Sequence, residues 1–124
     1  MTGTARRDLP ERTFEFARRI VRICRVLDRT PGVGRTLANQ LLRSGTSVGA
    51  NVEEGQASQS RADFIRCYSI ACKEARETNY WLRLLAASDV VEEPAVRELI
   101  TEANELVAIL TTIVKNARRN TRKE

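Results

Sequence analysis

Six polar residues stand where a catalytic or metal-binding site would first be sought in this sequence. They are Asn51, Glu53, Glu54, Lys73, Glu74 and Glu77. Carboxylates can transfer protons, but general acid–base catalysis uses histidine most often, and this chain has none. The sequence also lacks a P-loop, a dinucleotide-binding glycine pattern and metal-ligand spacing. We therefore expect no enzymatic activity, no bound metal and no cofactor.

The same polar residues have two structural interpretations. They can be solvated charges on helix faces, or they can bond to one another between two helices. We expect an interhelical polar network formed by Asn51, Glu54, Lys73 and Glu77.

Arginines offer a second kind of chemistry, the binding of phosphate groups. Residues 1–35 carry nine basic and four acidic side chains, and this difference of five equals the net charge of the whole chain. One basic stripe has helical spacing, and basic residues also cluster near the two chain ends. The residues concerned are Arg18, Arg22, Arg25 and Arg29 in the stripe, and Arg6, Arg7, Arg118, Arg119, Arg122 and Lys123 near the ends.

These residues predict binding to the backbone of RNA or DNA, weakened by salt. No known nucleic-acid-binding motif is present to read bases. The alternative is that the stripe pairs with an acidic stripe formed by Glu98, Glu102 and Glu105, within one subunit or between subunits.

Hydrophobic periodicity predicts the elements that carry these residues. We expect a single domain, 1–124, with helices at 9–29, 33–54, 61–87 and 94–119. Short connections favour antiparallel neighbours, so the predicted fold is an all-α, antiparallel up-and-down four-helix bundle. No apolar run is long enough to cross a membrane, and no signal peptide is apparent, so we expect a cytoplasmic protein.

Helix ends and core residues follow from local signals. Pro10 fits a first turn capped by Asp8, Ser60 with Asp63 resembles a capping box, and Gly55 fits a C-terminal stop with positive φ. Gly45 and Gly49 share a face and predict close helix packing, for which small residues at 71 and 75 are suited. The expected core stripes are Phe14, Ala17, Ile20, Val21, Cys24 and Leu27 in the first helix, and Phe64, Cys67, Tyr68, Ala71, Ala75, Thr78, Leu82 and Leu85 in the third.

Several large apolar residues fall outside these stripes. They are Phe16, Ile23, Val26, Ile70, Trp81 and Leu84. Because aromatic residues are typical interface anchors, this flank predicts self-association, with a broad intramolecular core as the alternative.

A resemblance to a known family rests on the middle of the chain. The segments are Gln40-Leu41-Leu42-Arg43, Ser47-Val48-Gly49-Ala50-Asn51-Val52-Glu53-Glu54-Gly55, Ser60 with Asp63-Phe64, and Lys73-Glu74-Ala75-Arg76-Glu77-Thr78 with Tyr80-Trp81-Leu82. They resemble the bacterial four-helix-bundle proteins related to the protein encoded by intervening sequences in large-subunit ribosomal RNA genes. Many relatives have proline where Gly49 stands.

The resemblance implies a bundle assembled as a ring-like homopentamer, with no agreed activity. A similar bundle is a basic accessory protein of the reverse transcriptase of diversity-generating retroelements. Two functions are therefore open: an oligomeric protein that binds RNA or other nucleic acid through a basic surface, or a structural or adaptor oligomer that binds a protein partner.

Overall fold

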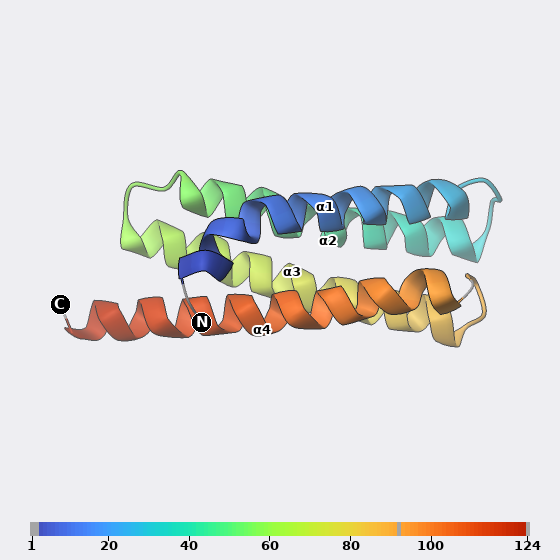
Figure 1. Ribbon diagram of the computed structural model, residues 1–124. Helices are drawn as coiled ribbons and strands as arrows, with labels where there is room; N and C mark the ends of the chain where they lie inside the picture. Colours follow the sequence, from blue (N-terminus) through green and yellow to red (C-terminus); the bar gives the residue numbers. More distant parts are fainter. Residues whose placement is uncertain (1–2, 92, 124) are drawn as a thin grey trace.

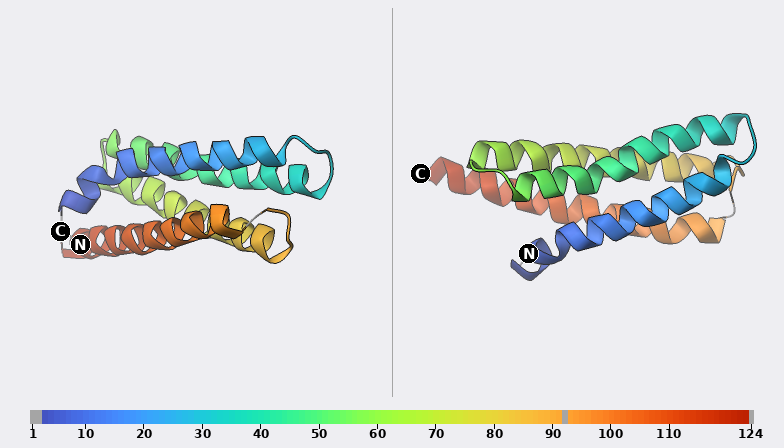
Figure 2. Two further views of the ribbon diagram at one scale, coloured as in Figure 1. Left: turned by 45° about the vertical axis from the view of Figure 1, so that its right-hand side comes forward. Right: turned by 90° about the horizontal axis from the view of Figure 1, so that it is seen from above.

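Four long helices make up the computed structural model, which describes residues 3–91 and 93–123, with side chains for 8–91, 94 and 96–121. The helices are α1 (Gly3–Leu27), α2 (Val33–Gln56), α3 (Arg61–Ala87) and α4 (Glu93–Lys123). Each runs antiparallel to the helix before it, which gives an up-and-down bundle (Figures 1 and 2). The all-α prediction and the order of the elements are confirmed. Within the described part of the chain, no helix is long and apolar enough to span a bilayer.

The first helix begins earlier than expected. It runs from Gly3, so Pro10 lies inside it and Asp8 does not cap it. Proline lacks the N–H that would bond one turn back, and such a site commonly bends a helix. The first turns of α1 are offset from the rest of the helix in Figure 1. The buried hydroxyl of Thr13 donates to the carbonyl oxygen of Leu9 at 2.9 Å.

The core face of α1 is rotated relative to the prediction. Phe16 and Ile23, assigned to a spare flank, are buried in the core of the single chain. Phe14 and Val21, assigned to the core, are exposed. Both assignments obey helical spacing because α1 is apolar on two sides. The face selected by the fold places Leu9, Thr13, Phe16, Ile20, Ile23, Cys24 and Leu27 inward.

Two glycines of α2 allow α1 to approach closely. A Cβ on Gly45 would lie 2.7 Å from Cγ2 of Ile20, and one on Gly49 would lie 3.2 Å from the carbonyl oxygen of Thr13. The prediction of close packing is confirmed, but the partner helix is α1, whereas the small residues at 71 and 75 belong to α3. Gly55 is also a packing residue, since a Cβ there would lie 2.7 Å from the ring of Tyr68. Its expected positive φ is wrong, because α2 continues to Gln56.

The third helix agrees with its prediction throughout. All eight residues of its expected stripe are buried. At its start, the hydroxyl of Ser60 accepts a bond from the backbone N–H of Asp63 at 3.1 Å, which confirms the cap. Deep in the bundle, the hydroxyl of Thr78 donates to that of Ser44 at 2.9 Å and so links α3 to α2.

All three cysteines are buried free thiols: Cys24 and Cys67 were expected in the core, and Cys72 of α3 is buried as well. Cys24 donates to the carbonyl oxygen of Ala38 at 3.4 Å. Burial, and then the negative charge of Asp28, raise the pKa of the Cys24 thiol to about 11.

Candidate nucleic-acid interface

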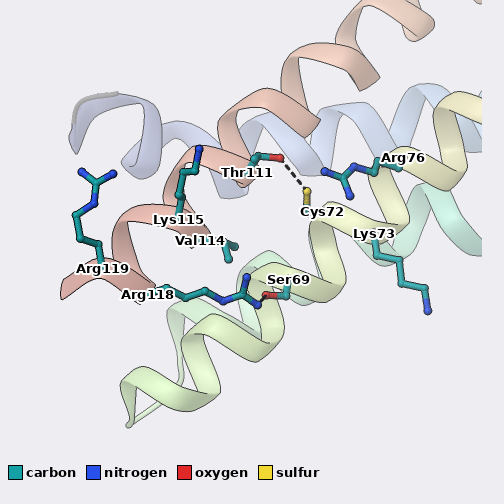
Figure 3. Close-up of a pocket in the computed structure, with 9 residues that line it drawn as sticks. All are labelled: Ser69, Cys72, Lys73, Arg76, Thr111, Val114, Lys115, Arg118 and Arg119. Carbon is teal, nitrogen blue, oxygen red and sulfur yellow. Dashed lines mark hydrogen bonds between the residues drawn. The ribbon is translucent and has the colours of Figure 1, made fainter. Parts of the chain in front are cut away.

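A groove of about 620 Å³ opens between α3 and α4, near the C-terminal end of α4 (Figure 3). Five of its nine lining residues are cationic and none is acidic. The lining residues are Ser69, Cys72, Lys73, Arg76, Thr111, Val114, Lys115, Arg118 and Arg119. We call this feature the basic groove.

The floor of the basic groove is uncharged. Cys72 and Thr111 are joined across it at 3.3 Å, and Val114 is buried beside them. The guanidinium of Arg118 reaches over to the hydroxyl of Ser69 at 3.4 Å. Figure 3 shows Arg76 also pointing toward this floor, whereas Lys73 and Arg119 point outward. The groove thus presents several N–H donors around a pair of hydroxyl groups.

A structural explanation accounts for this charge only in part. Cations near the C-terminus of a helix interact favourably with its dipole, but this effect falls off within the last turn. Lys115, Arg118 and Arg119 lie four to eight residues before the end of α4 at Lys123. Arg76 lies in the middle of α3. The accumulation of charge is therefore not explained by helix stabilisation.

The arginine stripe of α1 lies elsewhere. Because α1 and α4 run in opposite directions, the C-terminal half of α1 lies at the other end of the bundle from the basic groove (Figure 1). Arg18 pairs with Glu15 of its own helix at 3.0 Å. Arg22, Arg25 and Arg29 are exposed and form no ion pair with any residue that the structure describes.

The acidic stripe of α4 has other partners than the arginine stripe. Arg12 binds Glu102 with two hydrogen bonds of 2.8 Å and reaches Glu105 at 2.6 Å. Arg19 lies 3.3 Å from Glu98. The hydrogen bonds from Arg12, with its positive charge, hold the pKa of Glu102 below its usual value, although partial burial opposes this. Within one chain and among the described residues, the expected pairing of the two stripes does not form, because these acids bind Arg12 and Arg19 and so tie α4 to α1. Pairing between subunits stays a prediction.

The predicted basic residues thus do not form one site. Arg118 and Arg119 lie in the basic groove, and Arg22, Arg25 and Arg29 lie at the opposite end. The side chains of Arg6, Arg7, Arg122 and Lys123 lie outside the described residues. Sequence reasoning missed Arg76 and Lys115. The available signal was their spacing: Arg76 follows Lys73 by three residues and Lys115 precedes Arg118 by three, so each pair shares a helix face.

The predicted polar network does not form between its four members. The Asn51 amide donates within its own helix, to the carbonyl oxygen of Ser47 at 2.9 Å. Glu54 and Lys73 are exposed and form no ion pair within the described part of the chain. Glu77 accepts instead from the guanidinium of Arg43 on α2 and, at 3.0 Å, from the indole N–H of Trp81. Helices α2 and α3 are therefore linked by Arg43, which also binds Glu74.

The flank residues differ in exposure. Val26 is exposed, whereas Ile70, Trp81 and Leu84 are half-buried. Among the described residues, no group of three or more histidine, cysteine or acidic side chains is placed to hold a metal ion.

Comparisons with known proteins agree with this architecture. A family model described as the 23S rRNA-intervening sequence protein matches residues 8–112. A similar solved structure is the crystal structure of a protein with unknown function from the S23 ribosomal protein family of Bacteroides thetaiotaomicron VPI-5482. Its sequence is 36% identical to this chain, and the two structures superimpose with a TM-score of 0.80. The match covers 89% of this chain and 97% of that chain. A comparison with curated proteins found no match.

Proposed function

The chain belongs to the 23S rRNA-intervening sequence protein family, and from this premise we propose that it is a non-enzymatic bundle protein that binds RNA through the basic groove. The observation that carries the proposal is a groove lining with five cations and no acid. The chemistry of the groove suits the backbone of RNA or DNA, and we take RNA as the ligand to test first.

The chemistry of the basic groove fits phosphate groups. Guanidinium groups offer paired donors that match phosphate oxygens, and Ser69 and Thr111 add hydroxyl donors. The bond from Arg118 to Ser69 is long and exposed, so this guanidinium keeps donors for a ligand. Each cation that meets a phosphate releases condensed counterions, and this release drives binding at low salt.

Binding to a short RNA at about 50 mM salt, followed by fluorescence anisotropy, tests the proposal. The double variant Arg76→Gln/Arg118→Gln removes two cations from the basic groove. The matched control, Arg22→Gln/Arg29→Gln, removes two exposed cations at the opposite end that form no ion pair with a described residue. We expect the groove variant to lose at least tenfold in affinity and the control to lose much less.

Two outcomes would contradict the proposal. Equal losses in the two variants would assign binding to net charge or to the stripe on α1. No binding by the wild-type chain at this low salt would remove the nucleic-acid function altogether.

We also propose that the chain self-associates through an exposed apolar strip between α1 and α2. Phe14 is 61% exposed and lies in a groove with Ala17 and Ala50, and Val21 and Leu42 line a second groove between the same helices. Charged residues border these apolar side chains: Glu53 and Glu54 in the first groove, and Arg25 and Asp28 in the second. We propose this apolar strip as the interface in place of Phe16 and Ile23, because those two side chains are buried in the core of the single chain. A second copy of the chain is the expected occupant, and the ring of five implied by the family resemblance is the expected assembly.

Light scattering at micromolar concentration measures this self-association. Phe14→Glu should convert the assembly to monomers because a charge in an apolar interface stays unpaired. Val33→Glu is the control, since Val33 is 67% exposed, close to the value for Phe14, but lies at the start of α2, outside the strip. A monomeric wild-type chain would refute self-association. It would also remove the second candidate function, a structural or adaptor oligomer that binds a protein partner.

A further inference from the structure

An exposed tyrosine interrupts a row of cations on α3. Lys73, Arg76, Tyr80 and Arg83 follow one another at intervals of three, four and three residues, so they share one face of the helix. Lys73 and Arg76 line the basic groove, and Tyr80 lies one turn further along. Its side chain is 49% exposed.

Tyr80 has an arginine and an aromatic ring as neighbours on α3, and the arginine is linked through Asn79 to α4. The guanidinium carbon of Arg83 lies 5.9 Å from the centre of the Tyr80 ring. Arg83 donates to the side-chain oxygen of Asn79 at 2.8 Å, and Asn79 donates to Asn104 of α4 at 3.1 Å. Trp81 meets the tyrosine ring edge-on, with ring centres 5.1 Å apart. The ring is thus flanked by Arg83 and Trp81 and lies on the helix face that carries Lys73 and Arg76 into the basic groove.

We propose that Tyr80 is a base-stacking residue at the end of the basic groove, and that the groove therefore takes single-stranded RNA. This inference rests on the proposed RNA binding. Proteins that bind single strands combine a cationic groove with aromatic rings on which bases stack. In a duplex the bases are already stacked and paired, so Tyr80 would gain nothing from them. About 6 Å of helix separates Arg76 from Tyr80, so one strand can meet both.

The aromatic character of the residue matters more than its bulk. Phenylalanine keeps the planar ring, whereas leucine keeps apolar volume without a stacking face. Tyr80→Phe should therefore retain binding, and Tyr80→Leu should lose it. Because Tyr80 is half exposed and outside the core, both variants should keep the helix content of the wild-type chain by circular dichroism.

Three probes of equal length separate stacking from charge: a single-stranded RNA, the same strand with abasic sites throughout, and an RNA duplex. We expect the wild-type chain to bind the single strand about 5- to 150-fold more tightly than the abasic strand, the gain typical of one stacked base. Tyr80→Leu should reduce binding of the single strand to the abasic level and leave duplex binding unchanged. Arg76→Gln should weaken binding of all three probes.

The outcomes distinguish this inference from the function on which it rests. If Tyr80→Leu binds the single strand as tightly as wild type while Arg76→Gln weakens every probe, the stacking role is refuted and the basic groove remains an RNA site. If Tyr80→Leu loses the same factor in affinity for the duplex as for the single strand, the role of Tyr80 is structural and the inference fails. If no probe binds, the proposed function and the inference fail together.

Discussion

At Gly45, α1 lies so close to α2 that an added methyl group should change the free energy of unfolding. The sign of that change should depend on the side chain at position 20, which the methyl group would meet. In Gly45→Ala, the new Cβ would lie 2.7 Å and 2.9 Å from Cγ2 and Cγ1 of Ile20, and 3.2 Å from its Cβ. Ile20 is fully buried, and a β-branched side chain in a helix has one strongly preferred rotamer. These atoms therefore cannot swing away, and the two helices must shift.

The expected magnitude combines two opposing contributions. Overpacking a core costs about 1–3 kcal/mol, whereas replacing glycine with alanine inside a helix gains about 1 kcal/mol. Gly45→Ala should therefore lower the free energy of unfolding by up to about 2 kcal/mol. Ile20→Ala alone should lower it by about 2–5 kcal/mol because it leaves a cavity.

In the Ile20→Ala background the sign should reverse. The two closest atoms are gone and only the Cβ of residue 20 remains near, at 3.2 Å, so Gly45→Ala should raise the free energy of unfolding by up to about 1 kcal/mol through helix propensity. The resulting coupling between the two sites is about 1–3 kcal/mol. Urea unfolding followed by circular dichroism, at one protein concentration for all four chains, measures it. Equal effects of Gly45→Ala in both backgrounds would refute the packing described for α1 and α2.

Two further predictions concern pH. The lowered pKa of Glu102 means that its ionised form stabilises the fold above its ordinary pKa of 4.5, and that this stability is lost as pH falls through the lower folded value. Between pH 7 and pH 3, the free energy of unfolding of the wild-type chain should therefore fall by up to about 1 kcal/mol more than that of Glu102→Gln. The difference is small because the pair is partly solvated. Unfolding free energies that fall equally with pH in the two chains would contradict the Arg12–Glu102 contact. Cys24, with a pKa of about 11 in the fold against 9.0 ordinarily, ionises first in the unfolded chain, so stability should fall as pH rises between these values. Cys24→Ala should show a shallower fall in a series of unfolding curves, and an unchanged fall would mean that the thiol is not buried.

The sequence predicted α3 better than α1 for a physical reason. The stripe of α3 is defined by small and large residues on one side, and its buried members match the expectation. Apolar residues occur on two sides of α1, so periodicity alone allows Phe14 or Phe16 to be buried. The choice depends on which face meets α2, where Gly45 and Gly49 leave room for Ile20 and Thr13.

Charge counting overestimated the positive charge available on α1. Of its arginines, Arg12 and Arg19 bind acids of α4, and Arg18 binds Glu15. Such pairs depend on how two helices face each other, which composition cannot reveal. The basic groove was missed for the opposite reason: Arg76 and Lys115 are far apart in the sequence and meet only because α3 and α4 pack antiparallel.

The salt dependence of RNA binding tests the central claim most directly. For single strands, the logarithm of the binding constant falls with the logarithm of salt concentration by about 0.7 for each phosphate contact. If Arg76 and Arg118 each meet a phosphate, Arg76→Gln/Arg118→Gln should make the slope shallower by about 1.4, and Arg22→Gln/Arg29→Gln should leave it unchanged. A groove variant with the wild-type slope and affinity would show that RNA does not bind in the basic groove.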